Sequence, residues 1–548
     1  MSVKPPLLDL PIKIAERGFY NGFILDVTIT SKLAVGALVL WAVAFPQQAS
    51  DVLAGFNSFI LANFALWYFY VMAAFVLACI VLALWPAAGR MKLGGPDDEP
   101  EFSRFSWFSM MFGAGIGVGM LTWAVAEPIY HFNKNPDVIQ GLATSGGTDN
   151  VLNAFKWSYL HWGFSAWSSY AIAGLALGFF AYRRGLPLTI RSSLAPLFGR
   201  SLSGPVGHAI DIVAVIATIL GVAQMLGFGV EQFVAGMARI GIGDWLINEQ
   251  GTASSLGIIV AIVIIMGAST LSALSGVGKG IKWLSNLNMV LSTFLLGFFL
   301  LFGSSWFGLN ALFVGGFEYL MALPSMIFTV YSGDGETAKA LEGWQGAWSV
   351  FYWAWWVAFA PFVGLFLARI SKGRTIREFV VGAVIAPAIM CFVWFAFAGG
   401  TAIEMELTGI AGGAINSVPD GDKIFAMTGL MLSPVLGWLM AVLIVVLLMT
   451  YLVTSADSAV LIVNTINAAG DEGPKARPHI LFWGITLGMV VAALLLVGGL
   501  KAIQTAMVIG ALPFSLVMVL MCVSLFKAIY RDGMRERAGL QTTYEQVS

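Results

Sequence analysis

The stretch "FYWAWWVAFAP", from Phe351 to Pro361, lies inside a long apolar segment of the chain. Trp344 and Trp348 come shortly before it, so five of the 19 tryptophans fall within thirteen residues. Burial of an apolar segment needs leucine, isoleucine and valine, and it does not need a dense group of indole rings. The segment is therefore expected to be a membrane span that also forms part of a binding surface.

The whole chain has the composition of an integral membrane protein. Of its 548 residues, 58% are hydrophobic and 11% are charged, whereas a soluble protein carries about 25% charged residues. The net charge of −1 suggests no nucleic-acid partner. The three cysteines lie in apolar runs and the four histidines are scattered, so neither disulfides nor a metal-ligand spacing is indicated. We expect no cofactor, no enzymatic activity and no removable signal peptide.

Apolar stretches of about 20 residues predict transmembrane helices. The stretch 311–332, which contains Pro324, is expected to be a lateral helix between the seventh and eighth spans. The predicted fold class is an all-α polytopic membrane protein. Twelve spans are expected, at about 31–46, 58–86, 105–132, 151–182, 205–240, 253–275, 283–303, 344–370, 377–400, 433–463, 479–499 and 502–527.

The basic residues predict the orientation of these spans, because cytoplasmic loops carry an excess of lysine and arginine. With the amino terminus inside, all but six of the 29 basic residues lie in or beside cytoplasmic segments. We therefore expect a multi-pass protein of the plasma (inner) membrane with both termini in the cytoplasm. The six exceptions are Lys134, Lys156, Arg239, Lys339, Lys423 and Lys501.

The third span contains "GAGIGVGM", from Gly113 to Met120, with a glycine at every second position up to Gly119. Each glycine destabilises a helix by about 1 kcal/mol relative to alanine. One interpretation is a break at mid-membrane whose free carbonyls face a ligand, and the other is a small-residue face for close helix packing. The alternating spacing favours the break. Glu127-Pro128 is expected to end the span, with the Glu127 carboxylate as a structural cap.

The eighth span presents its indole rings on a helix that a proline interrupts. Trp353 and Trp356 share a face at i, i+3, whereas Trp355 is expected to point elsewhere. Trp356 lies in the middle of the apolar run beside Pro361, where an aromatic belt at the membrane interface does not explain it.

The fourth span supplies a second aromatic set in "HWGFSAWSSY", His161 to Tyr170. On a helix, Trp162, Trp167 and Tyr170 fall within an arc of about 140° and could line one wall of a cavity. His161 is expected to be a satisfied packing residue and not a proton carrier. Converging tryptophan and tyrosine faces bind a cation that cannot be hydrogen-bonded, above all a quaternary ammonium.

The tenth span carries "TYLVTSADSA", from Thr450 to Ala459. Polar side chains such as Thr454, Ser455 and Asp457 are costly in a membrane unless they are satisfied. A single hydroxyl could bond back to its own helix. Together with the carbonyls of a broken helix, the two hydroxyls are plausible oxygen ligands for an alkali cation.

These segments together resemble the betaine/choline/carnitine transporter family. The matching runs are "FSMMFGAGIGVGM", "AEPIYHF", "HWGFSAWSSY", "FYWAWWVAFAPFVGLFLARISKGRTIREF" and "VTSADS", in the expected order. The resemblance implies two inverted five-helix repeats of the LeuT-like type (spans 3–7 and 8–12), alternating access, and homotrimers in the lipid bilayer. The corresponding division is a tail 1–30, two peripheral helices 31–104, the first repeat 105–310, a lateral helix and external loop 311–343, the second repeat 344–527, and a tail 528–548.

The resemblance also implies the residues of the site. A second sodium site stays open, because Gln224 and Met225 stand where betaine members commonly have small hydroxyl residues. Phe359 stands where betaine carriers often have a tryptophan. The implied substrate box is Trp162, Trp167, Tyr170 and Trp356; the implied sodium ligands are the side chains of Thr454 and Ser455 and the carbonyls of Gly113, Ile116 and Tyr451; the surrounding region is Ala114, Gly115, Gly117, Gly119, Phe359 and Phe362.

The expected function is import of an onium solute similar to glycine betaine by sodium symport. Gly119 stands where proton-coupled choline members tend to have aspartate, and the hydroxyls of Thr454 and Ser455 are present, so sodium is favoured. A proton-coupled choline importer and a sodium-independent carnitine or betaine exchanger stay open. A channel would need a continuous polar pore and a sensor a soluble output domain, and neither is predicted. The basic residues of the short C-terminal tail are interpreted as a topology signal, with weak osmotic activation.

Overall fold

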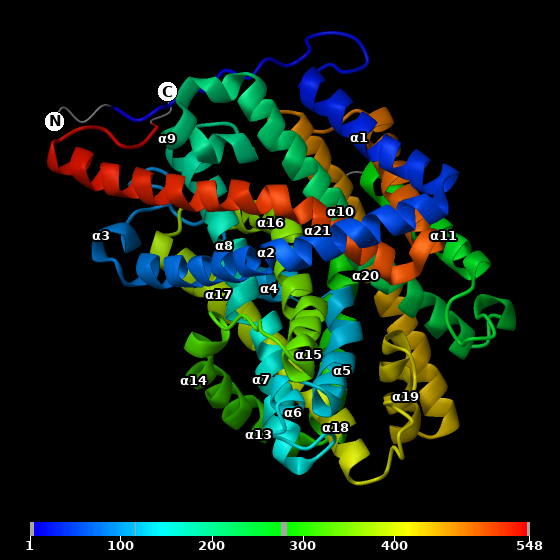
Figure 1. Ribbon diagram of the computed structural model, residues 1–548. Coiled ribbons are helices and arrows are strands. Elements are labelled where there is room, and N and C mark those ends of the chain that lie inside the picture. The colour runs from blue at the N-terminus through cyan, green and yellow to red at the C-terminus, as the bar shows by residue number, and fades with distance from the viewer. Residues whose placement is uncertain (1–4, 116, 276–281, 545–548) are drawn as a thin grey trace.

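The computed structural model describes residues 5–115, 117–275 and 282–544, with the backbone alone at 112–115 and 282. This part of the chain is almost entirely helical, and its only extended pairings are three isolated bridges. In Figure 1 several helices, among them α5 and α7, run along one direction, while α2 and the last part of α21 cross the bundle. An all-α fold is therefore confirmed.

Most of the described chain lies in long helices, joined by shorter ones. The long helices are α1 (Leu25–Ala44), α2 (Pro46–Leu84), α4 (Arg104–Gly115), α5 (Val118–Asn133), α7 (Val151–Trp162), α8 (Phe164–Gly178), α10 (Pro205–Arg239), α11 (Ser255–Ser275), α12 (Lys282–Phe302), α16 (Phe351–Arg369), α17 (Ile376–Trp394), α20 (Pro434–Asn467) and α21 (Arg477–Arg537). The shorter ones are α3 (Pro86–Gly89), α6 (Pro136–Ile139), α9 (Ala195–Phe198), α13 (Ser305–Asn310), α14 (Gly316–Met326), α15 (Glu336–Gln345), α18 (Gly400–Leu407) and α19 (Lys423–Met431).

Eleven helical stretches of the described chain are long and apolar enough to cross a membrane, so a polytopic membrane protein is confirmed. They do not reproduce the expected twelve. The stretch Ser305–Met326, expected to be lateral, is among them, and the divided pair α4 and α5 is not. Arg477–Arg537 counts once, although Gly498 and Gly499 have non-helical angles where two spans were expected to meet. The number of crossings and the division into repeats stay predictions.

The break expected in the third span is present. Helix α4 ends at Gly115 and α5 begins at Val118, with Gly117 in an extended conformation (φ −160°, ψ −168°). Ile116 lies outside the described residues. The expectation that the span ends at Glu127-Pro128 is wrong, because α5 continues through Pro128 to Asn133. Tertiary packing overrides the proline signal: Pro128 lies against Gly399, where an added Cβ would be 2.6 Å from the proline ring.

The fourth span is also divided, which the sequence analysis did not anticipate. Helix α7 ends at Trp162 and α8 begins at Phe164, with non-helical angles at Gly163 (φ −93°, ψ −132°). A Cβ at Gly163 would lie 2.4 Å from the Tyr159 carbonyl oxygen and 2.7 Å from the Phe392 ring. Glycine is required here because neighbouring atoms approach the backbone so closely.

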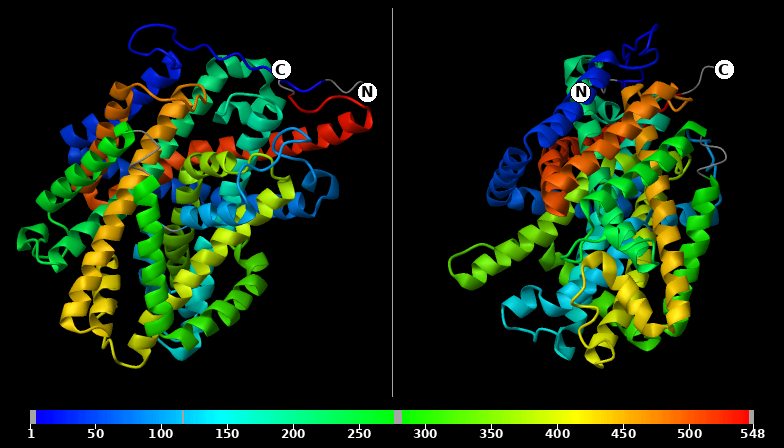
Figure 2. Two further views of the ribbon diagram at one scale, coloured as in Figure 1. Left: turned by 180° about the vertical axis from the view of Figure 1, so that it is seen from behind. Right: turned by 90° about the vertical axis from the view of Figure 1, so that its right-hand side faces the viewer.

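Polar contacts gather the interhelical segments into two groups that match the expected sides of the membrane. Contacts between segments expected in the cytoplasm are Leu93 N to Arg374 O (2.8 Å), Arg183 to Asp532 (3.3 Å), His479 to Phe19 O (2.8 Å) and Arg369 to Glu472. Contacts between segments expected outside are Asn133 to Asn416 (3.0 Å), Lys156 to Asp137 (3.2 Å) and Arg239 to Asp422 (3.2 Å). Figures 1 and 2 show the start of the described chain and the segment after α21 at the same end of the molecule. Which end faces the cytoplasm stays a prediction.

Candidate functional site

A cavity of about 720 Å³ lies among α4, α5, α7, α8, α10, α12, α16 and α20. The structure therefore brings together the aromatic and hydroxyl sets that the sequence placed on different spans. Gly113, Ala114 and Gly115 belong to the last turn of α4, where the backbone alone is described. The predicted site residues that line the cavity are Trp162, Trp167, Tyr170, Trp356, Gly117, Gly119, Phe359, Phe362, Tyr451, Thr454 and Ser455.

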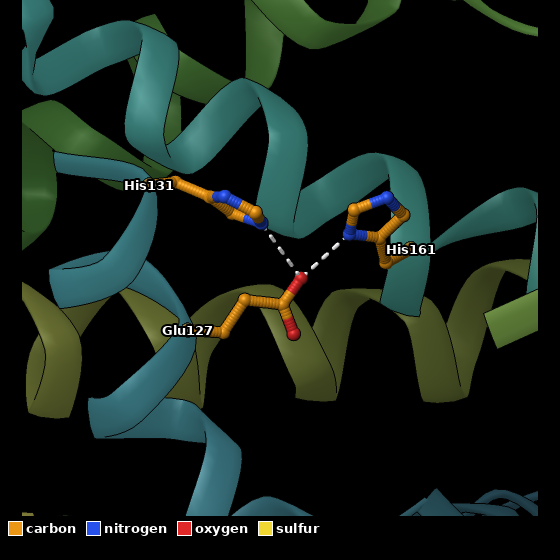
Figure 3. A group of neighbouring side chains, drawn as sticks. All are labelled: Glu127, His131 and His161. Atoms are coloured by element: carbon orange, nitrogen blue, oxygen red, sulfur yellow. Dashed lines mark hydrogen bonds and ion pairs between the residues drawn. The ribbon is translucent and has the colours of Figure 1, made fainter. Parts of the chain in front are cut away.

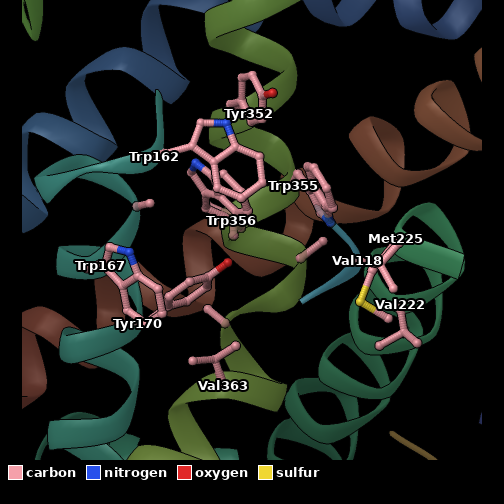
Figure 4. Close-up of a cluster of buried hydrophobic side chains, with 14 of the residues drawn as sticks. Val118, Trp162, Trp167, Tyr170, Val222, Met225, Tyr352, Trp355, Trp356 and Val363 are labelled. Carbon is pink, nitrogen blue, oxygen red and sulfur yellow. The ribbon is translucent and has the colours of Figure 1, made fainter. Parts of the chain in front are cut away.

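The four predicted box residues have rings that meet edge to face. The ring centroid of Trp356 lies 5.0 Å from that of Trp162 and 6.0 Å from that of Tyr170, with interplanar angles of 72° and 78°. Trp167 meets Tyr170 at 5.3 Å and 78°. Nearly perpendicular rings, which aromatic quadrupoles favour, form adjacent walls of a box between the end of α7, α8 and α16 (Figure 4). The Trp356 indole N–H donates to the carbonyl of His161 at 2.8 Å, which fixes its orientation.

The expectation that Trp355 points away while Trp353 shares the face of Trp356 is wrong. Trp355 lines the cavity and stacks on Trp356, with centroids 4.9 Å apart and planes at 15°. Trp353 is buried against Phe69 of α2, at 6.0 Å. Two successive residues on a helix differ by about 100°, and here the cavity faces the sector between them. Spacing gives these angles but not the direction of the cavity.

The cavity continues along one stripe of α16 to the end of that helix. Phe359, Phe362, Val363 and Phe366 line it after the box, and Arg369 follows. Thirteen residues separate Trp356 from Arg369, which corresponds to about 20 Å of helix. Among the described lining residues Arg369 is the one with a charged side chain, and it forms an ion pair with Glu472. One end of the cavity is thus aromatic, and an arginine that is paired with a glutamate lies at the other.

On the opposite side, α20 contributes the hydroxyls predicted to bind sodium. The Thr454 hydroxyl lies 2.9 Å from the Thr450 carbonyl and 3.1 Å from the Tyr451 carbonyl, and it accepts from the Asn288 amide at 3.2 Å. In this conformation it bonds back to its own helix, as a single hydroxyl in an apolar helix commonly does. Its role as a sodium ligand stays a prediction, as does that of Ser455. Asp457 is satisfied by Ser272 at 2.7 Å.

A buried polar cluster behind the box was missed from the sequence. The Glu127 carboxylate on α5 lies 2.7 Å from His161 Nδ1 and 3.2 Å from His131 Nε2 (Figure 3). Its other oxygen accepts from the indole N–H of Trp162 at 2.7 Å and from the Tyr352 hydroxyl. Glu127 therefore connects three helices, α5, α7 and α16, by hydrogen bonds, and it is not a helix cap. Its i, i+4 spacing to His131 is the one sequence signal that could have indicated the cluster.

His161 is a satisfied packing residue, as expected, since its second ring nitrogen lies 3.0 Å from the Ser349 hydroxyl. One glutamate and two histidines are also a donor set that zinc accepts. Ligands of a tetrahedral zinc ion lie about 3.3 Å apart, given metal–ligand distances near 2.0 Å. The 2.7 Å contact between Glu127 and His161 is that of a hydrogen bond, so a hydrogen-bonded network accounts for this arrangement.

Comparison with known proteins agrees with the geometry of the cavity. A family model described as "BCCT, betaine/carnitine/choline family transporter" matches residues 26–534. The chain belongs to this family.

Several relatives of this BCCT transporter are similar along nearly the whole chain. The probable glycine betaine transporter of Desulfitobacterium hafniense is 38% identical over 507 residues, covering 92% of this chain and 97% of the relative. The glycine betaine transporter OpuD of Bacillus subtilis is 36% identical over 500 residues, covering 90% and 92%. The osmo-dependent choline transporter BetT2 of Acinetobacter baylyi is 34% identical over 523 residues, covering 93% and 72%. The protein is thus a transporter and not an enzyme.

Two residues of α10 bear on the second sodium site left open for this BCCT transporter. Met225 lines the cavity. Gln224 is fully buried, and neither polar atom of its side chain has a hydrogen-bond partner among the described residues. An apolar thioether and an unpaired amide occupy this position instead of two hydroxyls.

Proposed function

We propose that this BCCT transporter imports a quaternary ammonium or related onium solute, glycine betaine above all, by sodium symport. The observation that carries the proposal is the box of Trp162, Trp167, Tyr170 and Trp356 on the wall of the 720 Å³ cavity. A trimethylammonium group offers no N–H to donate, so aromatic faces are its best partners. A primary amine would instead need carboxylates, and the described lining residues include none.

The names of the relatives support the choice of solute. Two of those compared are named as transporters or probable transporters of glycine betaine, and one as a transporter of choline. Both solutes carry the trimethylammonium group that the box suits. Phe359 and Phe362 continue the aromatic surface beyond the box, which offers an onium group further apolar contact as it moves along α16.

Sodium as the coupling ion is supported by two features. Thr454 and Ser455 line the same cavity as Gly117 at the helix break, and the Thr454 hydroxyl lies 3.1 Å from the carbonyl of Tyr451, another predicted ligand. A Cβ at Gly119 would lie 2.8 Å from the Trp162 ring. An aspartate there, the residue expected of proton-coupled choline members, would therefore require Trp162 to move. These features favour sodium over protons.

We further infer alternating access, with both termini in the cytoplasm of the plasma membrane and a homotrimeric assembly. Sodium would stabilise the divided helix α4–α5 against α20, and its contribution is limited to its differential affinity for the two states. The membrane potential adds about 2.3 kcal/mol per charge per 100 mV to inward transport. The end of the cavity at Arg369 lies in a segment that the positive-inside rule assigns to the cytoplasm.

The test is solute counterflow in liposomes containing the purified protein, with glycine betaine, choline, carnitine and dimethylsulfoniopropionate as substrates. Glycine betaine uptake is expected to depend on a sodium gradient. Equal uptake in potassium buffer without sodium would instead establish an exchanger. Choline uptake driven by a pH gradient alone would establish the proton-coupled importer. Failure to move any onium solute would overturn the proposal.

A further inference from the structure

The Glu127 carboxylate lies directly behind the aromatic box without lining the cavity itself. Its Oε2 atom accepts a hydrogen bond of 2.7 Å from the indole N–H of Trp162, and the Trp162 ring forms a wall of the cavity. Tyr352 donates to the same oxygen from α16, and it stands next to Trp162 in Figure 4. Glu127 is fully buried. A carboxylate is therefore separated from the cavity by one aromatic ring.

The contacts around Glu127 suit an ionised carboxylate. An indole N–H can only donate, and with the Tyr352 hydroxyl and two histidine nitrogens, four groups converge on the two carboxylate oxygens. An ionised carboxylate accepts all four, whereas a protonated one would have to donate to a histidine nitrogen or to the Tyr352 hydroxyl. Each histidine can donate to Glu127 as a neutral tautomer. No lysine or arginine of the described residues pairs with Glu127, so the cluster carries one net negative charge when both imidazoles are neutral.

We propose that Glu127 is the fixed counter-charge of the bound onium group and that it determines preference by net charge of the solute. This inference depends on the onium-binding function proposed above. An onium on the Trp162 face would lie about 7 Å from the carboxylate, given a cation–π distance below about 6 Å. In a poorly solvated cavity such a charge attracts strongly. Accepting the indole N–H also increases the electron density of the ring that faces the cation.

The same charge orients a zwitterion. The carboxylate of a betaine is repelled from Glu127, so it points away from the Trp162 wall and into the cavity. Glu127 thus favours a cationic onium more than a zwitterion of the same shape. A purely structural role, in which Glu127 only holds Trp162 and Tyr352 in place, would affect both solutes equally.

The experiment measures binding of three solutes of one shape to the purified full-length protein, by isothermal titration calorimetry at fixed sodium. They are glycine betaine (zwitterion), its carboxamide (net charge +1) and 3,3-dimethylbutanamide (neutral). In Glu127→Gln the carboxamide affinity should fall about 10- to 50-fold and that of glycine betaine about fivefold or less, from the Coulomb energies at these distances. Affinity for the neutral solute should not change.

Two matched variants separate charge from structure. Tyr352→Phe removes one donor to the same carboxylate and keeps the charge, so any loss should be equal for all three solutes. Glu127→Asp also keeps the charge and should leave the ratio of carboxamide to betaine affinity unchanged; it serves as the test if Glu127→Gln does not fold by size-exclusion chromatography.

Three results would overturn the inference: equal losses for the charged solutes in Glu127→Gln, a several-fold change of the ratio in Glu127→Asp, or a wild-type protein that binds betaine and not the carboxamide. A wild-type protein that binds neither would overturn the proposed function instead.

Discussion

At the scale of single residues, Trp356 is the member of the box that touches both other helices. It meets Trp162 of α7 and Tyr170 of α8, and its N–H is fixed by the carbonyl of His161. Trp356→Leu should therefore weaken onium binding about 2- to 30-fold, since one cation–π contact contributes about 0.5–2 kcal/mol. The measurement is glycine betaine affinity of the purified variant. Trp306→Leu is the control, because Trp306 is 85% exposed and lies outside the cavity.

Unchanged affinity of Trp356→Leu for every onium solute would contradict the assignment of the box. An equal loss in Trp306→Leu would point to a general effect of removing an indole. The two variants should be compared at matched monodispersity, so that a folding defect is not taken for a binding defect.

The predicted sodium ligands Thr454 and Ser455 can also be tested by single-residue changes. Thr454→Ala combined with Ser455→Ala should raise the sodium concentration for half-maximal uptake several-fold, because two oxygen ligands are lost from the side of α20 that faces the cavity. Thr450→Ala is the matched control: its hydroxyl also bonds back to α20, at 3.0 Å from Val446 O, but does not line the cavity. The measurement is initial uptake against sodium concentration, and an unchanged half-saturation in the double variant would reject the site.

At the scale of elements, the two glycines at the start of α5, Gly117 just before it and Gly119 within it, have different roles. A Cβ at Gly119 would meet the Trp162 ring at 2.8 Å, whereas one at Gly117 would meet no atom within 4 Å. The φ of Gly117 (−160°) is open to any residue. Gly119→Ala should therefore displace Trp162 and lower glycine betaine affinity several-fold, and Gly117→Ala should retain it. Calorimetry measures the glycine betaine affinity of both variants. Equal losses of affinity would show that binding depends on the helix break itself and not on the contact with the Trp162 ring.

Most helices could be predicted from the sequence, because a membrane span depends on local apolar composition. The break at Gly117 could also be predicted, since alternate glycines weaken a helix wherever it packs. The break at Gly163 could not, because a single glycine is a weak signal and the Phe392 ring that a Cβ there would meet comes from a distant helix. The continuation of α5 through Pro128 depends in the same way on packing against Gly399.

The residues of the candidate site also fall into two groups: those that the local sequence predicts and those whose role depends on distant helices. The box residues could be predicted because their chemistry is unusual in an apolar helix, whatever the neighbours are. Glu127 was misassigned because its partners come from α7 and α16, and no single segment contains that information. The prediction that Trp353, and not Trp355, lies on the binding face was wrong for a related reason. The direction of the cavity is a property of the assembled bundle.

At the scale of the whole molecule, the C-terminal segment is packed onto the residues that follow α8, one of the helices that carry the box. Asp532 is fully buried and pairs with Arg535 at 2.9 Å and with Arg183 and Arg184 just beyond α8. The backbone N–H of Tyr544 donates to the Arg183 carbonyl at 2.9 Å. A topology signal alone does not explain these charges, because a solvated tail would not bury them.

The buried ion pairs should make this C-terminal segment a stabilising part of the fold. Asp532→Asn should destabilise the protein by about 3–5 kcal/mol, because buried arginines lose their counter-charge. Glu536→Gln should cost about 1 kcal/mol or less, because the Glu536 side chain is 49% exposed where it meets Arg183. Thermal unfolding of both variants in detergent checks the stability.

Because the C-terminal segment stabilises the fold, we do not expect it to act as an osmotic sensor. A hyperosmotic step at fixed sodium gradient should raise initial uptake only weakly. Arg531→Gln with Arg537→Gln removes exposed charges that could contact an anionic leaflet and keeps the Asp532 pairs, so this double variant should respond like the wild type. A several-fold osmotic activation of the wild type that this variant loses would show that the tail senses the membrane.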